Sequence, residues 1–259
     1  MNNRSSASRR AALKQQQEAQ ARAQRTNRML IIAVAVVAVV VVAIVGVVLA
    51  QSMGEQTRSD AAQVQPANAT EQFGVEPYAG KAKDGAPHVV VYQNYLCGAC
   101  KVSSDLFHAS FESLADKGEI RLEFRQLAFA TKTSDDSFRA AMAVAAAGVV
   151  GKWTQYNDEV YANFPTQQGL AYPDELLREQ IPAKVGITGD DLTRFQQLYD
   201  AQATEKFVRD TIEQSGRDGI THTPTIKVNG KEVQFRDASG QPSVQLTDEA
   251  ILAKITENA

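Results

Sequence analysis

Cysteine is scarce in this chain of 259 residues, which contains only Cys97 and Cys100. Two cysteines exclude a framework of several disulfides and a zinc site with four cysteine ligands. An excess of positive charge is also missing, because 27 lysine and arginine residues face 30 aspartate and glutamate residues, giving a net charge of −3. This balance argues against a nucleic-acid-binding protein, which usually carries a basic domain or surface. The sequence also lacks internal repeats.

Charge and hydrophobicity are distributed unevenly along the chain. Residues 1–28 contain seven basic residues and one acidic residue, a net charge of +6, so the total of −3 leaves −9 for residues 29–259. Residues 29–50 contain no charged residue and consist mostly of valine and alanine. As a helix this segment is about 33 Å long, enough to cross a hydrocarbon core of about 30 Å. We predict a basic cytoplasmic tail over 1–28 and a single transmembrane helix over 29–50.

The basic flank also predicts the orientation. The positive-inside rule places the N-terminus in the cytoplasm and residues 51–259 on the extracytoplasmic side of the cell membrane. A cleavable signal peptide is the alternative, because Val48-Leu49-Ala50 has small residues where a peptidase could cut. Such peptides have apolar regions of about 7–15 residues, shorter than this one, which favours an uncleaved signal-anchor. In both cases the rest of the chain works where disulfides persist.

Residues 51–86 are rich in glutamine, alanine, serine and threonine and show no sustained apolar period. This composition predicts a flexible linker. The alternative is that Phe73 to Tyr78 packs on the domain as an extra edge. The globular domain is then 87–259, a suitable size for one core.

The first part of this domain has the pattern of a β-α-β unit. Val89 to Tyr92 is a continuous apolar run, as expected of a strand buried on both faces. Apolar residues from Val102 to Leu114 then repeat near the helical period, and Gly118 ends that helix. Ile120 to Leu127 alternates between apolar and polar residues, which is typical of a strand.

The remainder predicts a helical insert over about 134–216 and a return to strands. Thr225 to Val228 has strand character, and Asn229-Gly230 is a strong hairpin signal. A second strand follows over 231–235 and a terminal helix over about 247–256. The predicted fold class is therefore α/β, in the order β-α-β, helical insert, β-β-α.

The two cysteines lie where the first strand meets its helix. A helix N-terminus presents free N–H groups and a partial positive charge, which favour a thiolate at Cys97. The thiolate is the species that attacks a disulfide. Cys100 lies one turn further in, where it would be shielded and act as the resolving thiol.

Two simpler interpretations of the cysteine pair remain open. A structural disulfide is one, although a loop of about four residues contributes only about 2 kcal/mol of stability. Metal binding is the other, with His88, His108 and His222 as the available histidines. His108 lies eight residues after Cys100, about 12 Å along the helix, too far to share a metal with the pair. His222 remains a candidate ligand.

A second motif lies far along the chain. Thr223-Pro224 immediately precedes the strand over 225–228, and such a proline can take a cis bond, although it often only begins a strand. Together, Val89 to Cys100 and Thr223 to Gly230 resemble the thioredoxin superfamily. Within it they are most similar to exported DsbA-like thiol–disulfide oxidoreductases, particularly membrane-anchored forms of actinobacterial type.

This resemblance implies a thioredoxin-like fold over 87–259 with the helical insert inside it. It implies that Cys97 attacks, that Cys100 resolves, and that Thr223-Pro224 forms a cis-proline loop that binds the substrate backbone. It implies no cofactor beyond the redox-active Cys97–Cys100 disulfide. The expected partners are exported proteins with cysteines and a quinone-linked membrane thiol oxidase of the DsbB or vitamin-K-epoxide-reductase type.

The chain also departs from the family pattern. Gly98-Ala99 replaces the Pro-His of the strongly oxidising members, which predicts a milder oxidant. Gln93 and Asn94 lie where relatives often have acidic residues, so the proton acceptor for Cys100 is unidentified. No further cysteine is available for the structural bridge of some relatives.

The sequence thus predicts a membrane-anchored, extracytoplasmic thiol–disulfide oxidoreductase that forms or exchanges disulfides in exported proteins. A reductase or isomerase supplied with electrons across the membrane is the alternative within the same chemistry. A copper metallochaperone using Cys97, Cys100 and His222, and a non-catalytic binding module, are alternatives from other classes.

Overall fold

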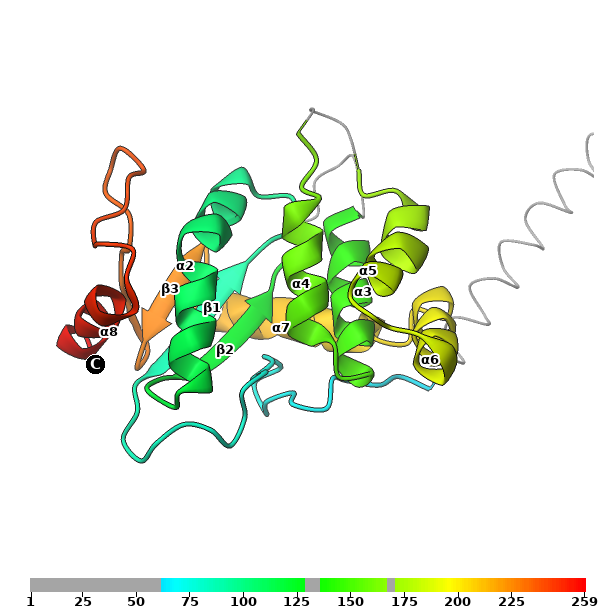
Figure 1. Cartoon of the computed structure of the whole chain (residues 1–259), viewed down its shortest axis with the longest axis horizontal. Helices are drawn as coiled ribbons and strands as arrows, with labels where there is room; N and C mark the ends of the chain where they lie inside the picture. The colour runs from blue at the N-terminus through cyan, green and yellow to red at the C-terminus, as the bar shows by residue number, and fades with distance from the viewer. Residues whose placement is uncertain (1–61, 129–135, 167–170) are drawn as a thin grey trace, which may run out of the picture. The chain divides into compact units, whose positions relative to one another are not determined.

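A computed structural model describes residues 62–128, 136–166 and 171–259 of the chain. Its centre is a sheet with the strand order β2-β1-β3-β4 (Figure 1). The strands are β1 (His88–Gln93), β2 (Arg121–Gln126), β3 (Thr225–Val228) and β4 (Lys231–Glu232). β1 and β2 are parallel and are joined through helix α2 (Gly98–Asp116), which confirms the predicted β-α-β unit.

Helices cover both faces of the sheet. The alternation of side chains along β1 sends Val89 and Val91 into the main core, which includes α2 and α8 (Asp248–Glu257). Val90 and Tyr92 point the other way and pack near Ile212 of α7 (Glu205–Arg217). Figure 1 shows α2 in front of the sheet and α7 behind it. β1 is therefore buried on both faces, as its continuous apolar run predicts.

The helical insert comprises α3 (Asp136–Val149), α4 (Trp153–Ala162), a π-helical turn η1 (Leu176–Gln180), α5 (Ile181–Lys184) and α6 (Gly189–Asp200). Most residues of α3 are buried alanines, valine or glycine, and such small side chains let neighbouring helices approach closely. The predicted insert ended near 216, but α7 contacts β2 and covers the second face of the sheet. The insert proper therefore ends with α6.

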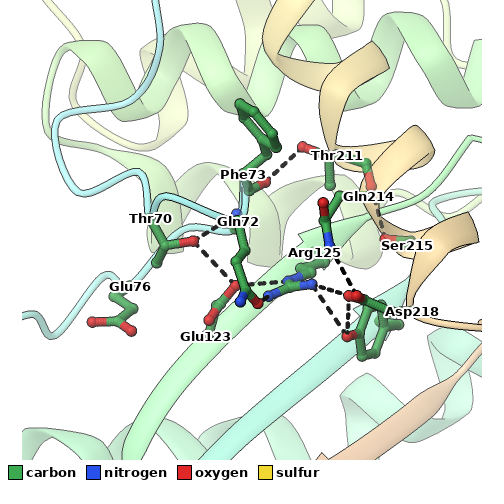
Figure 2. Close-up of polar contacts among 12 residues, drawn as sticks. Thr70, Gln72, Phe73, Glu76, Glu123, Arg125, Thr211, Gln214, Ser215 and Asp218 are labelled. Carbon is green, nitrogen blue, oxygen red and sulfur yellow. Dashed lines mark hydrogen bonds and ion pairs between the residues drawn. The ribbon is translucent and has the colours of Figure 1, made fainter.

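The polar side of β2 is buried in the fold. The alternating pattern of this strand is typical of one solvent-facing side, yet Glu123 and Arg125 each expose only 2% of their side chains. Arg125 donates hydrogen bonds to Glu123 (2.7 Å), to Gln72 (2.7 Å) and to Asp218, which follows α7 (Figure 2). Tyr92 also donates to Asp218, at 3.1 Å. A buried ion network thus satisfies polar groups that the pattern alone assigns to solvent.

Part of the predicted flexible linker over 51–86 is packed against this network. Val75 is 3% exposed and forms an isolated β-bridge to Phe124 of β2. Thr211 of α7 donates a hydrogen bond to the carbonyl of Phe73 at 2.6 Å (Figure 2). The linker prediction is therefore wrong for these residues, and the alternative of an extra edge over Phe73 to Tyr78 describes them. A short segment without an apolar period can still be fixed by backbone pairing and a few buried side chains.

The C-terminal part follows its sequence signals closely. Asn229 and Gly230 have φ values of +46° and +85°, as the two central residues of a type I′ hairpin require. The second strand is shorter than the predicted 231–235. Thr247 begins the last helix by accepting a hydrogen bond from the amide of Ala250 at 3.3 Å.

The predicted tail over 1–28, the transmembrane helix over 29–50 and residues 51–61 lie outside the described residues. Within the described ranges, no helix combines the length and hydrophobicity needed to cross a membrane.

Candidate active site

The two cysteine sulfurs lie at the start of α2. Cys97 is the N-cap residue, with extended backbone angles, and helical residues begin at Gly98. The carbonyl of Asn94 accepts a hydrogen bond from the Cys97 amide at 3.1 Å, which closes the turn after β1. Cys97 is half-buried, and Gly98 and Ala99 are exposed. The sulfur of Cys97 is therefore accessible at the positive end of the helix. Cys97 itself lies immediately before the first helical residue.

The surroundings of the two sulfurs make them chemically different. Hydrogen bonds from the Cys100 thiol and, at 3.4 Å, the Cys100 amide lower the pKa of Cys97 to about 5, although burial opposes them. Cys100 is only 1% exposed, and the adjacent Cys97 thiolate together with burial raises its pKa well above the ordinary value. The pair therefore consists of a thiolate that faces solvent and a protonated thiol beneath it.

The loop before β3 meets this pair directly. β1 and β3 are antiparallel, with Tyr92 opposite Thr225, so the turn after β1 and the loop before β3 lie at the same end of the sheet. The Thr223–Pro224 peptide bond is cis. The Cys97 thiol lies 3.3 Å from the carbonyl oxygen of Thr223. The structure thus brings together all four predicted site residues, Cys97, Cys100, Thr223 and Pro224.

Tyrosines that the sequence analysis did not assign to the site hold the cysteine turn from behind. Tyr161 of α4 donates a hydrogen bond to the carbonyl of Asn94 at 3.3 Å. Tyr172, which precedes η1, donates to the carbonyl of Tyr95 at 2.9 Å. Both tyrosines are at most 2% exposed. They lie more than 60 residues from the turn in the sequence, so no local pattern connects them with it.

A buried amide cluster supports the same turn. The side-chain oxygen of Asn157 accepts hydrogen bonds from Gln93 (3.0 Å), Tyr95 (2.8 Å) and Gln126 (3.4 Å). Gln93 is one of the two residues at the place where relatives often carry an acid. Its side-chain amide donates to Asn157, and an amide does not ionise near neutral pH.

The sulfurs do not join a set of metal ligands in the described part of the chain. Neither Cys97 nor Cys100 belongs to a group of three or more potential ligand side chains there. His222, the third ligand of the copper hypothesis, is exposed and lies 3.6 Å from Glu232. The arrangement of the described residues around the sulfurs suits thiol exchange, because the half-exposed Cys97 has a lowered pKa and the buried Cys100 is held behind it.

Comparison of the sequence with known protein families identifies the family of this chain. The thioredoxin family profile matches residues 74–246, two thirds of the chain, so the protein belongs to that family. The match begins within the segment predicted as a linker, in agreement with the packing of Val75. The search among curated proteins found no match.

Solved structures with a similar fold include thiol–disulfide oxidoreductases of bacteria. MdbA of Corynebacterium diphtheriae is 19% identical, with a TM-score of 0.53 over 69% of this chain and 92% of that one. BdbD of Bacillus subtilis is 22% identical, with a TM-score of 0.56 over 77% and 98%. DsbA of Mycobacterium tuberculosis is 20% identical, with a TM-score of 0.52 over 72% and 92%. At these identities the likeness establishes a DsbA-like fold.

Proposed function

We propose that this protein is a thiol–disulfide oxidoreductase that forms or exchanges disulfides in exported proteins. The observation that carries the proposal is the position of the Cys97 sulfur, which is half-exposed at the start of α2 and 3.3 Å from the Thr223 carbonyl. The names of the structural neighbours support the same chemistry.

The oxidative reaction begins from the Cys97–Cys100 disulfide. A substrate thiolate attacks the Cys97 sulfur, the bond between the two cysteines breaks, and Cys100 leaves with the electron pair and takes up a proton. A second thiolate of the substrate then attacks the substrate sulfur of the mixed disulfide. The substrate disulfide forms, and Cys97 leaves as a thiolate. The substrate is oxidised by two electrons and the cysteine pair is reduced to a dithiol.

The geometry supports attack at Cys97 rather than at Cys100. Cys97 is accessible, whereas Cys100 is 1% exposed and its sulfur accepts a hydrogen bond from the Asn94 amide at 3.4 Å. The Thr223-Pro224 loop lies beside the accessible sulfur. A substrate chain that presents its cysteine to Cys97 would run along this loop, with the backbone of Thr223 within reach.

The same features support the oxidising direction. A thiolate stabilised at Cys97 favours the reduced pair, and a pair that is stable when reduced readily oxidises its substrates. The absence of the Pro-His dipeptide still predicts a milder oxidant than the strongest members. Reoxidation is assigned to a quinone-linked membrane thiol oxidase. The anchor predicted over 29–50 would keep the enzyme beside that partner on the extracytoplasmic side.

A Cys100→Ala variant of the full-length protein tests the proposal. It should accumulate mixed disulfides between Cys97 and exported proteins in cells, visible as adducts that reducing agent releases, whereas Cys97→Ala should form none. The potential of the wild-type pair, measured against glutathione, should lie between about −270 and −120 mV. No adducts with Cys100→Ala, together with a Cys97 thiol titrating near 8.5, would reject the proposal. A potential well below this range would favour the reductase alternative.

A further inference from the structure

The proposed exchange requires a proton to move to and from Cys100, a buried thiol. When Cys100 attacks a mixed disulfide at Cys97 it must lose its proton, and when it leaves as a thiolate it must regain one. The raised pKa of Cys100 makes the free thiolate rare at neutral pH. Val91 and Gln93 line a small cavity with Cys100, and the backbone amide of Asn94 donates to its sulfur, but none of the three residues has an ionising side chain. The proton must therefore travel further.

A ridge of α2 leads away from Cys100. Ser104 follows Cys100 by four residues and His108 follows Ser104 by four, a spacing that places consecutive members next to one another on one helix face. The Ser104 hydroxyl lies 3.4 Å from Nδ1 of His108. Each step along the ridge covers about 6 Å of the helix axis. Cys100 and His108 are thus about 12 Å apart along the helix. The Ser104 hydroxyl lies between them and can both accept and donate a proton.

A small cavity lies between Cys100 and Ser104. Cys100, Ser103, Ser104 and His108 line it together with Gln93, Phe111 and Pro224, and its volume is about 10 Å³. A single water needs about this much space and two to four polar partners. The serine hydroxyls, the Gln93 amide and the Cys100 thiol provide those partners.

His108 is built to hold a proton. Its ring is 7% exposed and stacks on Phe124 with ring centres 4.9 Å apart. Nε2 lies 3.3 Å from Glu112 of the same helix and 3.6 Å from Asp158 of α4, without regular hydrogen-bond geometry to either. Tyr78, from the N-terminal segment, also faces Glu112 and Asp158. Burial lowers the pKa of His108, but Glu112 and Asp158 more than offset it, so the pKa is above the ordinary value.

We infer that His108 is the proton store for Cys100, reached through one water in the cavity and the Ser104 hydroxyl. This inference rests on the proposed thiol–disulfide exchange. When Cys100 attacks, its proton passes to the water. The water gives a proton to the Ser104 hydroxyl, and the Ser104 hydroxyl gives its proton to Nδ1 of His108. Cys100 forms its bond to Cys97, and the bond from Cys97 to the leaving thiolate breaks. The reverse transfer protonates Cys100 when a substrate thiolate attacks the disulfide. Glu112 and Asp158 balance the imidazolium charge.

The test uses the reduced full-length protein and the aromatic disulfide 5,5′-dithiobis(2-nitrobenzoate) in a stopped-flow instrument. Attack by Cys97 releases a first nitrothiobenzoate, and attack by Cys100 on the resulting mixed disulfide releases a second. The two rates are measured from pH 5 to 9 for the wild type and for His108→Gln and Ser104→Ala. Ser110→Ala is the matched control, because it removes a hydroxyl from the same helix away from the cavity. Glu112→Gln tests the charge balance.

We expect His108→Gln and Ser104→Ala to slow the second release at pH 7 by about 100-fold, the lower end of a general base contribution. In His108→Gln the inflection near the histidine pKa should vanish and the rate should rise with hydroxide throughout. Glu112→Gln should move the inflection to lower pH. The first release should be unchanged in every variant, which also shows that each variant keeps its site, and Ser110→Ala should match the wild type.

A second release in His108→Gln with the rate and pH profile of the wild type would overturn the inference, and Cys100 would then exchange its proton with solvent directly. If instead the wild-type first release follows the pH dependence of a free cysteine, the proposed function itself fails. The two failures are therefore distinguishable.

Discussion

The sulfur of Cys97 lies 3.3 Å from the carbonyl oxygen of Thr223, although 126 positions separate the two residues. Antiparallel pairing of β1 with β3 is the cause, because it brings the end of one strand beside the start of the other. The accessible sulfur and the loop beside it are therefore both held in place by the sheet. Tyr161 and Tyr172 fix the intervening turn from the helical insert.

The Cys97 thiol should ionise well below the ordinary cysteine value. In the reduced protein its alkylation by iodoacetamide should reach a plateau above about pH 6, because the thiolate is then fully formed with its pKa near 5. In Cys100→Ala, which removes the hydrogen bond from the Cys100 thiol, the plateau should move to higher pH. Rates that keep rising through pH 8.5 in the wild type would contradict the assignment.

The same ionisation should make the stability of the reduced protein depend on pH. A thiol with a lowered pKa in the folded state adds stability above its unfolded pKa of about 8.5, and this stability is lost as the pH falls toward 5. The melting temperature of the reduced protein, relative to the oxidised protein, should therefore rise from pH 5 to 8. Reduced Cys97→Ser cannot form the disulfide, so it is compared with the same oxidised wild-type protein, and most of this rise should then be missing. An equal difference at both pH values would contradict the prediction.

Asn157 should be necessary for the stability of the cysteine turn. Asn157→Ala leaves the buried donors of Gln93, Tyr95 and Gln126 without their shared acceptor, and unmatched buried donors cost about 1–3 kcal/mol each. We expect a loss of about 3 kcal/mol in urea unfolding. Asn163→Ala, in the exposed C-cap of the same helix, is the control and should cost less than about 1 kcal/mol.

Arg125 should be essential to the polar face of β2. Replacing it with methionine removes the guanidinium between Glu123 and Asp218 and leaves buried Glu123 with the His88 ring at 3.0 Å. Breaking a buried pair in this way costs about 3–5 kcal/mol. Arg121→Met is the control, since Arg121 lies on the same strand but is 48% exposed and pairs with Glu76 at the surface. Its cost should stay below about 1 kcal/mol. Equal costs for the two variants in chemical denaturation would argue against a buried network.

Gly118 tests whether the segment before β1 is packed on the domain. A Cβ at Gly118 would lie 2.3 Å from the carbonyl oxygen of Lys81, whereas one at Gly85 would meet nothing within 4 Å. Both glycines have φ values between +74° and +78°. The backbone cost of an alanine, about 1–2 kcal/mol, is therefore the same at the two positions. Gly118→Ala should therefore destabilise the protein by about 1–3 kcal/mol more than Gly85→Ala. Identical costs would mean that Lys81 is not held there.

Local patterns predicted most of the elements because their signals lie within a few residues. The apolar run before the cysteines, the Asn229-Gly230 turn and the helical period after Cys97 each indicated the observed structure. The packing of Val75 and the role of α7 were not predictable in this way. A single β-bridge leaves no periodic trace, and an amphipathic helix does not show whether it covers a sheet or other helices.

The sequence alone predicted the cysteine pair, its place at a helix start and the proline before β3, since the spacing of two cysteines and a proline before a strand are local facts. Only the tertiary structure decided that Thr223 touches Cys97, that the polar side of β2 is buried, and that His108 shares a cavity with Cys100. These relationships depend on strand pairing and on which helix covers which face. Contacts between distant segments are selected by the burial of the whole chain, so no short stretch of residues encodes them.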